Sequence, residues 1–254
     1  MQISISNAIG GGGGAQGAGG SSFTNTKSIL LDGVDDLVTM GDVLNMANDG
    51  TDAYSISCWY KTTHTGSFQI FVSKQKNTSA FNGFSLSMRG DLQRFNFFLG
   101  TTAGNARLAG RTGTISTIRD GNWHHVCLTY DGSQAIGGFT LYFDGASQSI
   151  TTEYNNTPTD VSNTEDFNIG ARGSAALFFD GNIDETSYFN TELSASDVTA
   201  IYNSGVPASL SSYSSLVSWW RCGDGDTAPT LTDNKGSNNG TMENFSTFST
   251  DVPT

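Results

Sequence analysis

Apolar and polar residues alternate along many short stretches of this chain, and residues 123–130 show the pattern clearly. Successive side chains of an extended strand point to opposite faces. One face here carries His124, Val126, Leu128 and Tyr130. Asp131-Gly132 then signals a turn, because glycine adopts positive φ without steric cost. A second strand, residues 139–143, ends on the same dipeptide at Asp144-Gly145. Two consecutive strands with this ending predict an antiparallel meander.

Stretches of similar length and composition recur on both sides of this pair. Gly, Asn and Asp residues separate them, which is typical of the turns between antiparallel strands. The strands that this pattern predicts are residues 28–31, 37–40, 54–61, 68–74, 83–88, 94–99, 106–110, 147–152, 167–170, 177–189 and 216–222. A long series of short strands predicts an all-β sandwich or barrel.

One short helix interrupts the series of strands. Ser194 is a good N-cap, and Asp197 stands three residues further on, which is a weak form of the capping box. Gly205 is placed to end the helix. One apolar face of this helix comprises Val198, Ile201 and Tyr202. The residues from 223 onward lack apolar runs and are expected to be extended or rich in loops.

Residues 1–22 differ from the rest of the chain. The stretch from Gly10 to Ser22 is rich in Gly and Ser, so it cannot bury a core, and we expect a flexible tether. Two interpretations stay open. The segment is either a disordered tail or a short strand, containing Ile3 and Ile5, that docks on a partner with the glycines as its leash.

Charge and composition narrow the range of functions. The chain has 254 residues and a net charge of −12, which argues against a nucleic-acid binder because such a protein needs a basic face. Membrane insertion is not expected, since no apolar run approaches the roughly 20 residues of a membrane helix. The first residues lack a basic region followed by an apolar segment, so export by a signal peptide is not expected either. Charged residues make up only 14%, and a polar surface rich in Ser, Thr and Asn is common outside the cell and on assembled particles.

Several motifs, taken together in their order and spacing, resemble one family. They are LLDGVDDLV at residues 30–38, ISCWY at 56–60, WHHVCLTYDG at 123–132, LYFDG at 141–145, IG at 169–170, FDGNIDE at 179–185 and LSASD at 193–197. This set resembles the laminin-G-like and pentraxin-like branch of the concanavalin A-like lectin/glucanase superfamily. The resemblance implies an antiparallel jelly-roll sandwich of two sheets.

The resemblance also suggests how the chain is divided. It covers residues 27–205, so we expect a Gly-rich N-terminal arm at 1–26, the jelly roll at 27–205 and a C-terminal extension at 206–254 that packs on or beside it. Within this extension, residues 219–224 and 232–241 resemble segments that accompany such domains in phage structural proteins.

The chain has three cysteines, none of them in a CxxC motif. Cys58 and Cys127 fall where pentraxins carry a disulfide between neighbouring strands, and alternation along both strands is expected to point them inward. The resemblance therefore implies a Cys58–Cys127 disulfide. Two buried free thiols are the alternative, because cysteine is a common core residue. Cys222 is expected to be unpaired.

An acidic turn is a candidate metal site. Asp32, Asp35 and Asp36 lie within five residues, and carboxylate oxygens in a turn suit Ca²⁺. In the related fold the strand that carries Asp32 lies near the strand that carries Asp184. We therefore predict a structural Ca²⁺ site formed by Asp32, Asp35 and Asp184 with backbone carbonyls. Alternatively, Asp32 and Asp35 cap the turn by hydrogen bonds to its backbone.

No catalytic residue is predicted. Glucanases of the superfamily use two closely spaced carboxylates, and the nearest approach here, residues 180–185, lacks the pair of glutamates on one strand face. His124 and His125 lie in a structural strand without a nucleophile motif. A calcium-dependent ligand site of the pentraxin type is not expected either, because residues 74–78 and 171–174 lack carboxylates. The residues that bind a ligand are not predicted.

These features predict a non-enzymatic virion structural protein, a capsid decoration or fibre-type component that displays a lectin-like domain for adhesion or particle stabilisation. The expected partners are a capsid or tail protein bound through the arm, a glycan of the host surface, and further copies of the chain on the particle. The expected location is the virion, after synthesis in the host cytoplasm, or otherwise the extracellular space. The alternative is a free carbohydrate-binding lectin, and a glycan hydrolase is the least supported reading.

Overall fold

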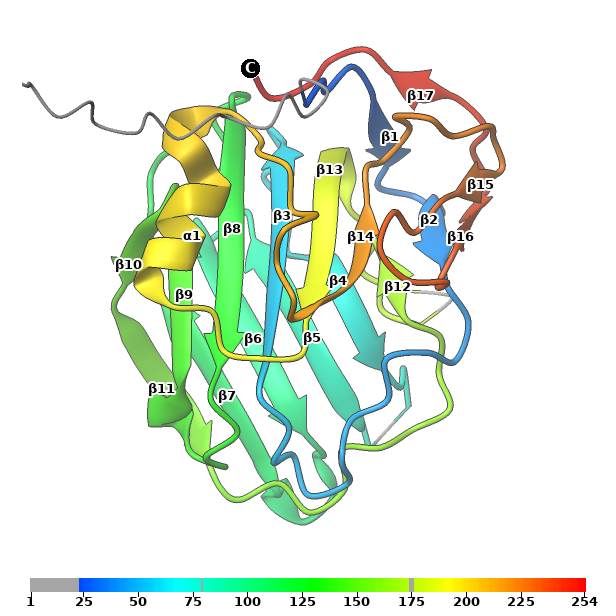
Figure 1. Ribbon diagram of the computed structural model, residues 1–254. Coiled ribbons are helices and arrows are strands. Elements are labelled where there is room, and N and C mark those ends of the chain that lie inside the picture. The colour runs from blue at the N-terminus through cyan, green and yellow to red at the C-terminus, as the bar shows by residue number, and fades with distance from the viewer. Residues whose placement is uncertain (1–22, 79, 174–175) are drawn as a thin grey trace, which may run out of the picture.

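The computed structural model describes residues 23–78, 80–173 and 176–254, so most of the predicted N-terminal arm lies outside the described residues. In this described part, two antiparallel sheets pack face to face, and a single short α-helix lies against one of them (Figure 1). The predicted all-β sandwich of two sheets is confirmed. Within the described part of the chain, no helix combines the length and the apolar character that crossing a membrane requires.

Sheet A has the strand order β10-β9-β8-β3-β13-β1-β17, and β14 also pairs with β13. The long strand β13 carries two partners along one edge, since β1 pairs with its first half and β14 with its second half. The strands of sheet A are β1 (Ser28–Asp32), β3 (Tyr54–Lys61), β8 (Trp123–Tyr130), β9 (Phe139–Phe143), β10 (Ala146–Gln148), β13 (Asp180–Phe189), β14 (Leu216–Trp220) and β17 (Phe248–Ser249).

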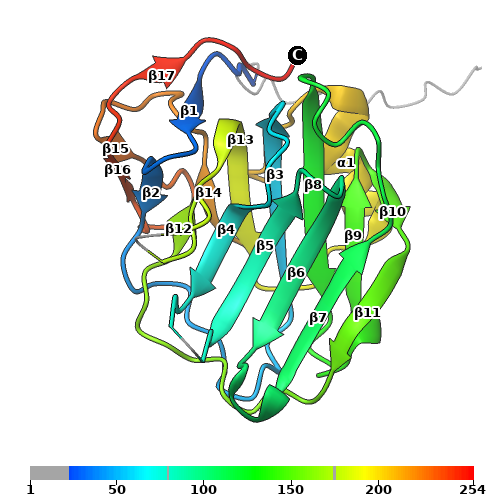
Figure 2. The same cartoon turned by 180° about the vertical axis from the view of Figure 1, so that it is seen from behind.

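Sheet B has the strand order β11-β7-β6-β5-β4-β12-β2-β16-β15, and Figure 2 shows its outer face. Its strands are β2 (Leu37–Thr39), β4 (Phe68–Gln75), β5 (Gly83–Arg89), β6 (Arg94–Gly100), β7 (Arg107–Thr112), β11 (Ile150–Asn155), β12 (Asn168–Ile169), β15 (Thr230–Leu231) and β16 (Gly240–Glu243). Three 3-10 turns are described in addition, at Ala103–Asn105, Ile136–Gly138 and Asn203–Gly205.

The core between the sheets is built largely from aromatic side chains. Tyr60 of sheet A meets Phe71 of sheet B with ring centroids 4.8 Å apart, and Phe95 packs on both rings. All three side chains are fully buried. The hydroxyl of Tyr60 donates a hydrogen bond to the carbonyl of Ile118, so its burial leaves no unpaired polar atom. Truncating Phe71 to alanine would cost about 3–5 kcal/mol.

The helix α1 (Ala195–Tyr202) covers the outer face of sheet A (Figure 1). Ser194 and Asp197 form a complete capping box, as their spacing predicted. A second, smaller apolar cluster lies under the helix and comprises Cys127, Tyr142, Phe189, Leu193, Val198, Ile201, Leu210, Leu216 and Trp219. Helix α1 thus lies over the outer face of sheet A, whereas no helix of the described residues lies over the outer face of sheet B (Figure 2).

In two parts of the sequence, the observed strands differ from those that the alternation of apolar and polar residues predicted. The predicted strand at residues 147–152 is two strands, because the chain leaves sheet A after Gln148 and enters sheet B at Ile150. The alternation of apolar and polar residues along a strand does not indicate which sheet the strand joins. The C-terminal residues, expected to be extended or rich in loops, include β15, β16 and β17, which add strands to both sheets.

The structure has the free-thiol alternative for Cys58 and Cys127 in place of the disulfide that the resemblance implies, and the expectation that both side chains point inward is wrong. All three cysteines are free thiols. Across β3 and β8, Cys58 is paired with Val126 and Cys127 with Ser57. The two cysteines are therefore offset by one position, and such an offset places their side chains on opposite faces of the sheet. Cys58 lies in the core between the sheets, whereas Cys127 lies under the helix.

Candidate functional site

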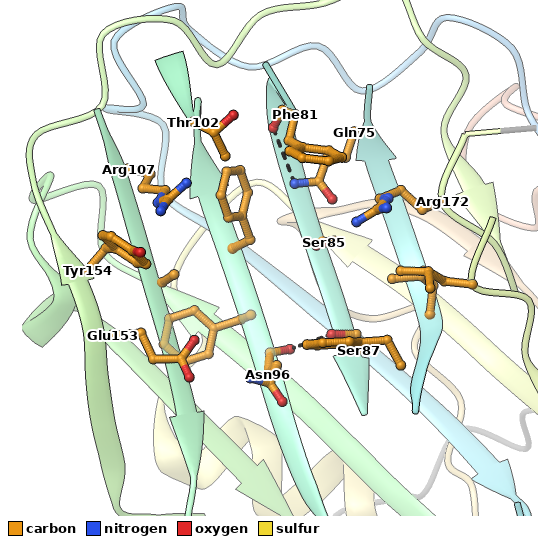
Figure 3. Close-up of a pocket in the computed structure, with 16 residues that line it drawn as sticks. Gln75, Phe81, Ser85, Ser87, Asn96, Thr102, Arg107, Glu153, Tyr154 and Arg172 are labelled. Carbon is orange, nitrogen blue, oxygen red and sulfur yellow. Dashed lines mark hydrogen bonds between the residues drawn. The ribbon is translucent and has the colours of Figure 1, made fainter. Parts of the chain in front are cut away.

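A hollow of about 240 Å³ lies on the open outer face of sheet B (Figure 3). Strands β4, β5, β6, β7 and β11 supply most of its lining. Segments beside these strands add Phe81, Thr102, Arg172 and Leu177. None of these residues was predicted to be functional.

The floor of the hollow is low because its side chains are small. Along β5, Phe84, Leu86 and Met88 turn into the core, so the alternate positions Ser85 and Ser87 face outward. The adjoining strands contribute Asn96 and Ala109 to the same floor. Phe98 stands between Ser85 and Ala109 on the same face. The short side chains beside it leave a depression, with arginines and further aromatic rings at its margin.

Asn96 brings an unpaired acceptor to this floor. Its side chain is 6% exposed, and its Oδ1 atom makes no hydrogen bond within the described residues. The nearby Ser87 Oγ donates to the backbone carbonyl of Asn96 over 3.3 Å and leaves the amide oxygen unpartnered. A buried polar atom without a partner costs about 1–3 kcal/mol, so a ligand hydroxyl that donates to it would recover this energy.

Two arginines stand on opposite sides of the hollow, each against an aromatic ring (Figure 3). The guanidinium carbon of Arg107 lies 3.6 Å from the ring centroid of Tyr154, and that of Arg172 lies 4.7 Å from the ring centroid of Phe81. Contact with a ring face attracts a cation and also restricts how its guanidinium is oriented. The N–H donors of each guanidinium group therefore point in a fixed direction.

Glu153 is the one carboxylate among the residues that line the hollow. It forms an ion pair with Arg111 over 3.0 Å, and Arg94 approaches it at 3.9 Å. The register of β11 against β7 shifts between Thr152 and Tyr154, and this bulge leaves the consecutive residues Glu153 and Tyr154 both lining the hollow.

The structure brings together part of the predicted calcium site. Carboxylate oxygens of Asp32, Asp35 and Asp36 lie within 4.8 Å of one another. Asp32 Oδ1 also accepts hydrogen bonds from the backbone of Val34 and Asp35, which matches the turn-capping alternative. The hydrogen bond from Val34 is the main cause that lowers the pKa of Asp32. Occupation by Ca²⁺ stays a prediction, and a calorimetric titration of chelator-treated protein that shows no heat would exclude it.

Asp184 does not join this acidic turn. Asp32 pairs with Asp180 across β1 and β13, so Asp184 lies four positions further along β13. Its side chain is fully buried, and Oδ2 accepts a hydrogen bond of 2.8 Å from Asn25. Burial and the neighbouring Glu185 raise its pKa well above the ordinary range.

Glu185 is also buried, with 3% of its surface exposed. Its carboxylate accepts hydrogen bonds from the indole of Trp219 and from Arg221 Nε. Burial raises its pKa to about 7, and the charge of Arg221 opposes this rise. Asp184 and Glu185, two of the three carboxylates in residues 180–185, are thus enclosed and partnered within the protein.

The two adjacent histidines have structural partners. His124 lies between Asp144 and Asp120, at 2.8 Å and 3.1 Å. His125 Nε2 lies 2.7 Å from Ser57 Oγ, and both side chains are buried. Burial lowers the pKa of His125 to about 4, so it is neutral at physiological pH. Neither histidine is among the residues that line the hollow.

Comparison with known proteins agrees with this architecture. A family model described as the concanavalin A-like lectin/glucanases superfamily matches residues 32–199. A candidate carbohydrate-binding protein of Bacteroides ovatus is similar in structure, with a TM-score of 0.63 and 13% identity over 91% of this chain and 62% of that one. The CBM40 module of the Ruminococcus gnavus IT-sialidase, solved with α2,3-sialyllactose, has a TM-score of 0.50 and 16% identity over 69% of this chain and 97% of that one.

No curated protein matches the sequence. The two solved structures share the fold at low identity, and the chain spans 62% of the length of the first. The family model covers more than half of the chain, from the acidic turn to the helix, and includes the strands that form the hollow. The chain therefore belongs to the concanavalin A-like lectin/glucanases superfamily.

Proposed function

We propose that this protein is a non-catalytic glycan-binding domain, with the hollow on sheet B as its binding site. The observation that carries this proposal is the lining: small side chains, among them Ser85, Ser87 and Asn96, lie beside aromatic rings and guanidinium groups. Sugars present apolar C–H faces that pack on aromatic rings and hydroxyls that need donors and acceptors. A concave site with apolar walls and a few converging polar groups suits such a ligand.

The size of the hollow favours a short ligand. Its volume of about 240 Å³ lies below the roughly 300–1,000 Å³ of sites that enclose drug-sized molecules. A terminal sugar unit fits this space better than an internal stretch of a long polysaccharide.

The arrangement of carboxylates supports binding without hydrolysis. Glycoside hydrolysis commonly needs two carboxyl groups across the scissile bond. Among the residues that line the hollow, Glu153 is the one carboxylate, and Arg111 engages it. The similar solved structures are described by carbohydrate binding, which favours the same reading.

For the biological setting, we propose display on an assembled particle as a capsid decoration or fibre-type component. The support comes from the sequence, which has a Gly-rich arm before the domain and a net charge of −12 that disfavours association with nucleic acid. The arm would bind a capsid or tail protein, and several copies would face outward. A free lectin is the alternative. Finding the native protein on purified particles favours display, and finding it only unattached favours the free lectin.

A glycan array probed with the complete chain tests the binding proposal. We expect selective binding that is lost in Ala109→Leu, because a larger side chain would occupy the floor of the hollow. Ala146→Leu adds the same bulk at an exposed position on β10 of the other sheet and serves as the matched control. An absence of binding to every glycan, or binding that survives Ala109→Leu in a folded protein, would overturn the proposal.

A further inference from the structure

Arginine is concentrated on one face of this acidic protein. Five of the seven arginines in the sequence belong to sheet B or to the segment beside it. They are Arg89, Arg94, Arg107, Arg111 and Arg172. The chain as a whole carries a net charge of −12. A local excess of cations therefore stands out against an anionic surface.

Several arginines form an ion pair with a nearby carboxylate, which neutralises their charge. Arg89 pairs with Asp91 and Arg111 with Glu153 on this face. Arg221, which is not among the residues that line the hollow, pairs with Glu185. These three guanidinium groups are engaged within the protein.

Arg107 and Arg172 differ, because no ion pair is described for either of them. Arg107 rests on the ring of Tyr154, and its Nε atom is buried without a hydrogen-bond partner. Arg172 rests on the ring of Phe81, donates from Nη2 to Asn77 Oδ1 over 3.2 Å, and also has a buried, unpaired Nε. Both guanidinium groups line the hollow from opposite sides (Figure 3).

The environment of Arg172 shows an uncompensated charge. Burial lowers the pKa of its guanidinium, as expected where solvent is withdrawn and no carboxylate replaces it. Arginine nevertheless stays protonated at neutral pH. The charged residues that line the hollow are Arg107, Arg172 and Glu153, so the lining carries a net charge of +1. With Glu153 engaged by Arg111, two cations face the space.

We propose that the hollow binds the acidic sugars of a glycan, through carboxylate or sulfate groups held by Arg107 on one side and by Arg172 on the other. A guanidinium offers parallel N–H donors that match two oxygens of such a group, and a ring beneath it fixes the direction of those donors. Asn96 Oδ1 supplies an acceptor for a hydroxyl of such a sugar. This inference rests on the proposed glycan binding and specifies which sugars are selected.

Matched oligosaccharides test the inference by calorimetry on the complete chain. The probes are 3′-sialyllactose and trigalacturonate as carboxylates, a 3′-sulfated lactose as the sulfate, and lactose as the neutral control. We expect at least one acidic probe to bind about tenfold or more tightly than lactose, and this preference to weaken as salt is raised. The comparison between carboxylates and the sulfate identifies which anionic group is bound.

Variants that each remove one charge show which residues cause the preference for acidic probes. We expect Arg107→Gln and Arg172→Gln each to weaken binding of the acidic probe by roughly tenfold or more, since each removes a charge-assisted hydrogen bond. Arg119→Gln removes the same charge outside the residues that line the hollow and should leave binding within about twofold. Thermal unfolding of each variant verifies that it is folded.

The outcomes separate this inference from the proposed function. Equal binding of lactose and every acidic probe, lost in Ala109→Leu, would overturn acidic selectivity and leave glycan binding intact. An acidic preference that Arg119→Gln reduces as much as Arg107→Gln would also contradict the inference, because it would reflect net charge. An absence of binding to any glycan or probe would overturn both.

Discussion

Arg107 of β7 stacks on Tyr154 of β11, with its guanidinium carbon 3.6 Å from the ring centroid. The two residues lie 47 positions apart, and they meet because the chain crosses from sheet A to sheet B at Ser149 and then adds β11 beside β7. The bulge between Thr152 and Tyr154 brings the ring to this position. The stack therefore depends on topology and on a local irregularity together.

Replacing Tyr154 tests whether the ring orients Arg107. We expect Tyr154→Ala to weaken binding of the preferred acidic oligosaccharide by about tenfold, because a partly desolvated cation–π contact contributes about 1–2 kcal/mol. Tyr154→Phe retains the ring and should bind almost as well as the wild type. Calorimetry measures both affinities. Equal losses in the two variants would assign the effect to the hydroxyl and contradict the role of the stack.

The stability of these variants provides the control. Tyr154 is 39% exposed, and its truncation removes its contact with Arg107 and part of its packing, so we expect the free energy of unfolding to fall by about 1–2 kcal/mol. Urea denaturation of Tyr154→Ala measures this value. A loss of several kcal/mol would mean that weaker binding reflects partial unfolding.

A single carboxylate organises the turn between β15 and β16. Asp233 Oδ1 accepts hydrogen bonds from the backbone N–H groups of Trp219, Lys235 and Gly236, and Oδ2 accepts one from Asn238. Although burial works to raise it, these N–H groups hold the pKa of Asp233 below its ordinary value. Asp233→Ala leaves several donors unpaired, and we expect a loss of about 2–4 kcal/mol in urea denaturation.

A control and a pH series make this prediction specific. Asp166→Ala, at an exposed position with a described bond to Thr39, should change stability much less. Because the pKa of Asp233 is lowered on folding, its contribution is present above the ordinary value of 3.8 and is lost as the pH falls below it. The gap between Asp233→Ala and wild type should therefore narrow in acid. A gap that stays constant to pH 2 would contradict the carboxylate's role.

The three thiols are expected to be free and unreactive in the native state. Burial raises the pKa of Cys58, Cys127 and Cys222, and only the thiolate reacts readily. A thiol titration with Ellman's reagent should find almost no reaction in the native protein and three thiols in urea. A single thiol in urea would indicate the disulfide that the register of β3 and β8 rules out.

Strands were predicted well because alternation is a local property of the sequence. The turn signals after Tyr130 and Phe143 mark the ends of β8 and β9 as the structure has them. The expectation that Cys58 and Cys127 both point inward failed for a different reason, since the face on which a side chain lies depends on a register of one residue between two strands. That register is fixed by packing across the whole sheet.

The candidate site could not be predicted from local patterns in the sequence. Ser87, Asn96 and Ala109 lie on three consecutive strands, and their short side chains form a hollow only because those strands are neighbours. The outward polar positions of the 83–88 stretch were a usable signal, as a strand with one apolar face and serines on the other has an exposed side. Arg172 lies outside these strands, so only the fold places it opposite Arg107.

The last prediction concerns the buried carboxylates of β13 and the pH dependence of stability. Burial raises the pKa of Glu185 to about 7 in the folded protein, whereas an ordinary glutamate titrates near 4.5. Between these values the native state holds a proton that the unfolded state has lost. The free energy of unfolding therefore falls as the pH rises through this window. His125, whose pKa burial lowers to about 4, instead makes the free energy of unfolding rise with pH. The test is therefore a comparison of variants.

Glu185→Gln removes this titration while keeping an acceptor for the Trp219 indole. We expect its stability, measured by urea denaturation from pH 4.5 to pH 7, to fall less steeply than that of the wild type. Glu192→Gln, at an exposed position before the helix, is the matched control and should keep the wild-type slope. If Glu185→Gln also keeps that slope, then Glu185 is ionised throughout the window, and its ion pair with Arg221 outweighs the cost of burial.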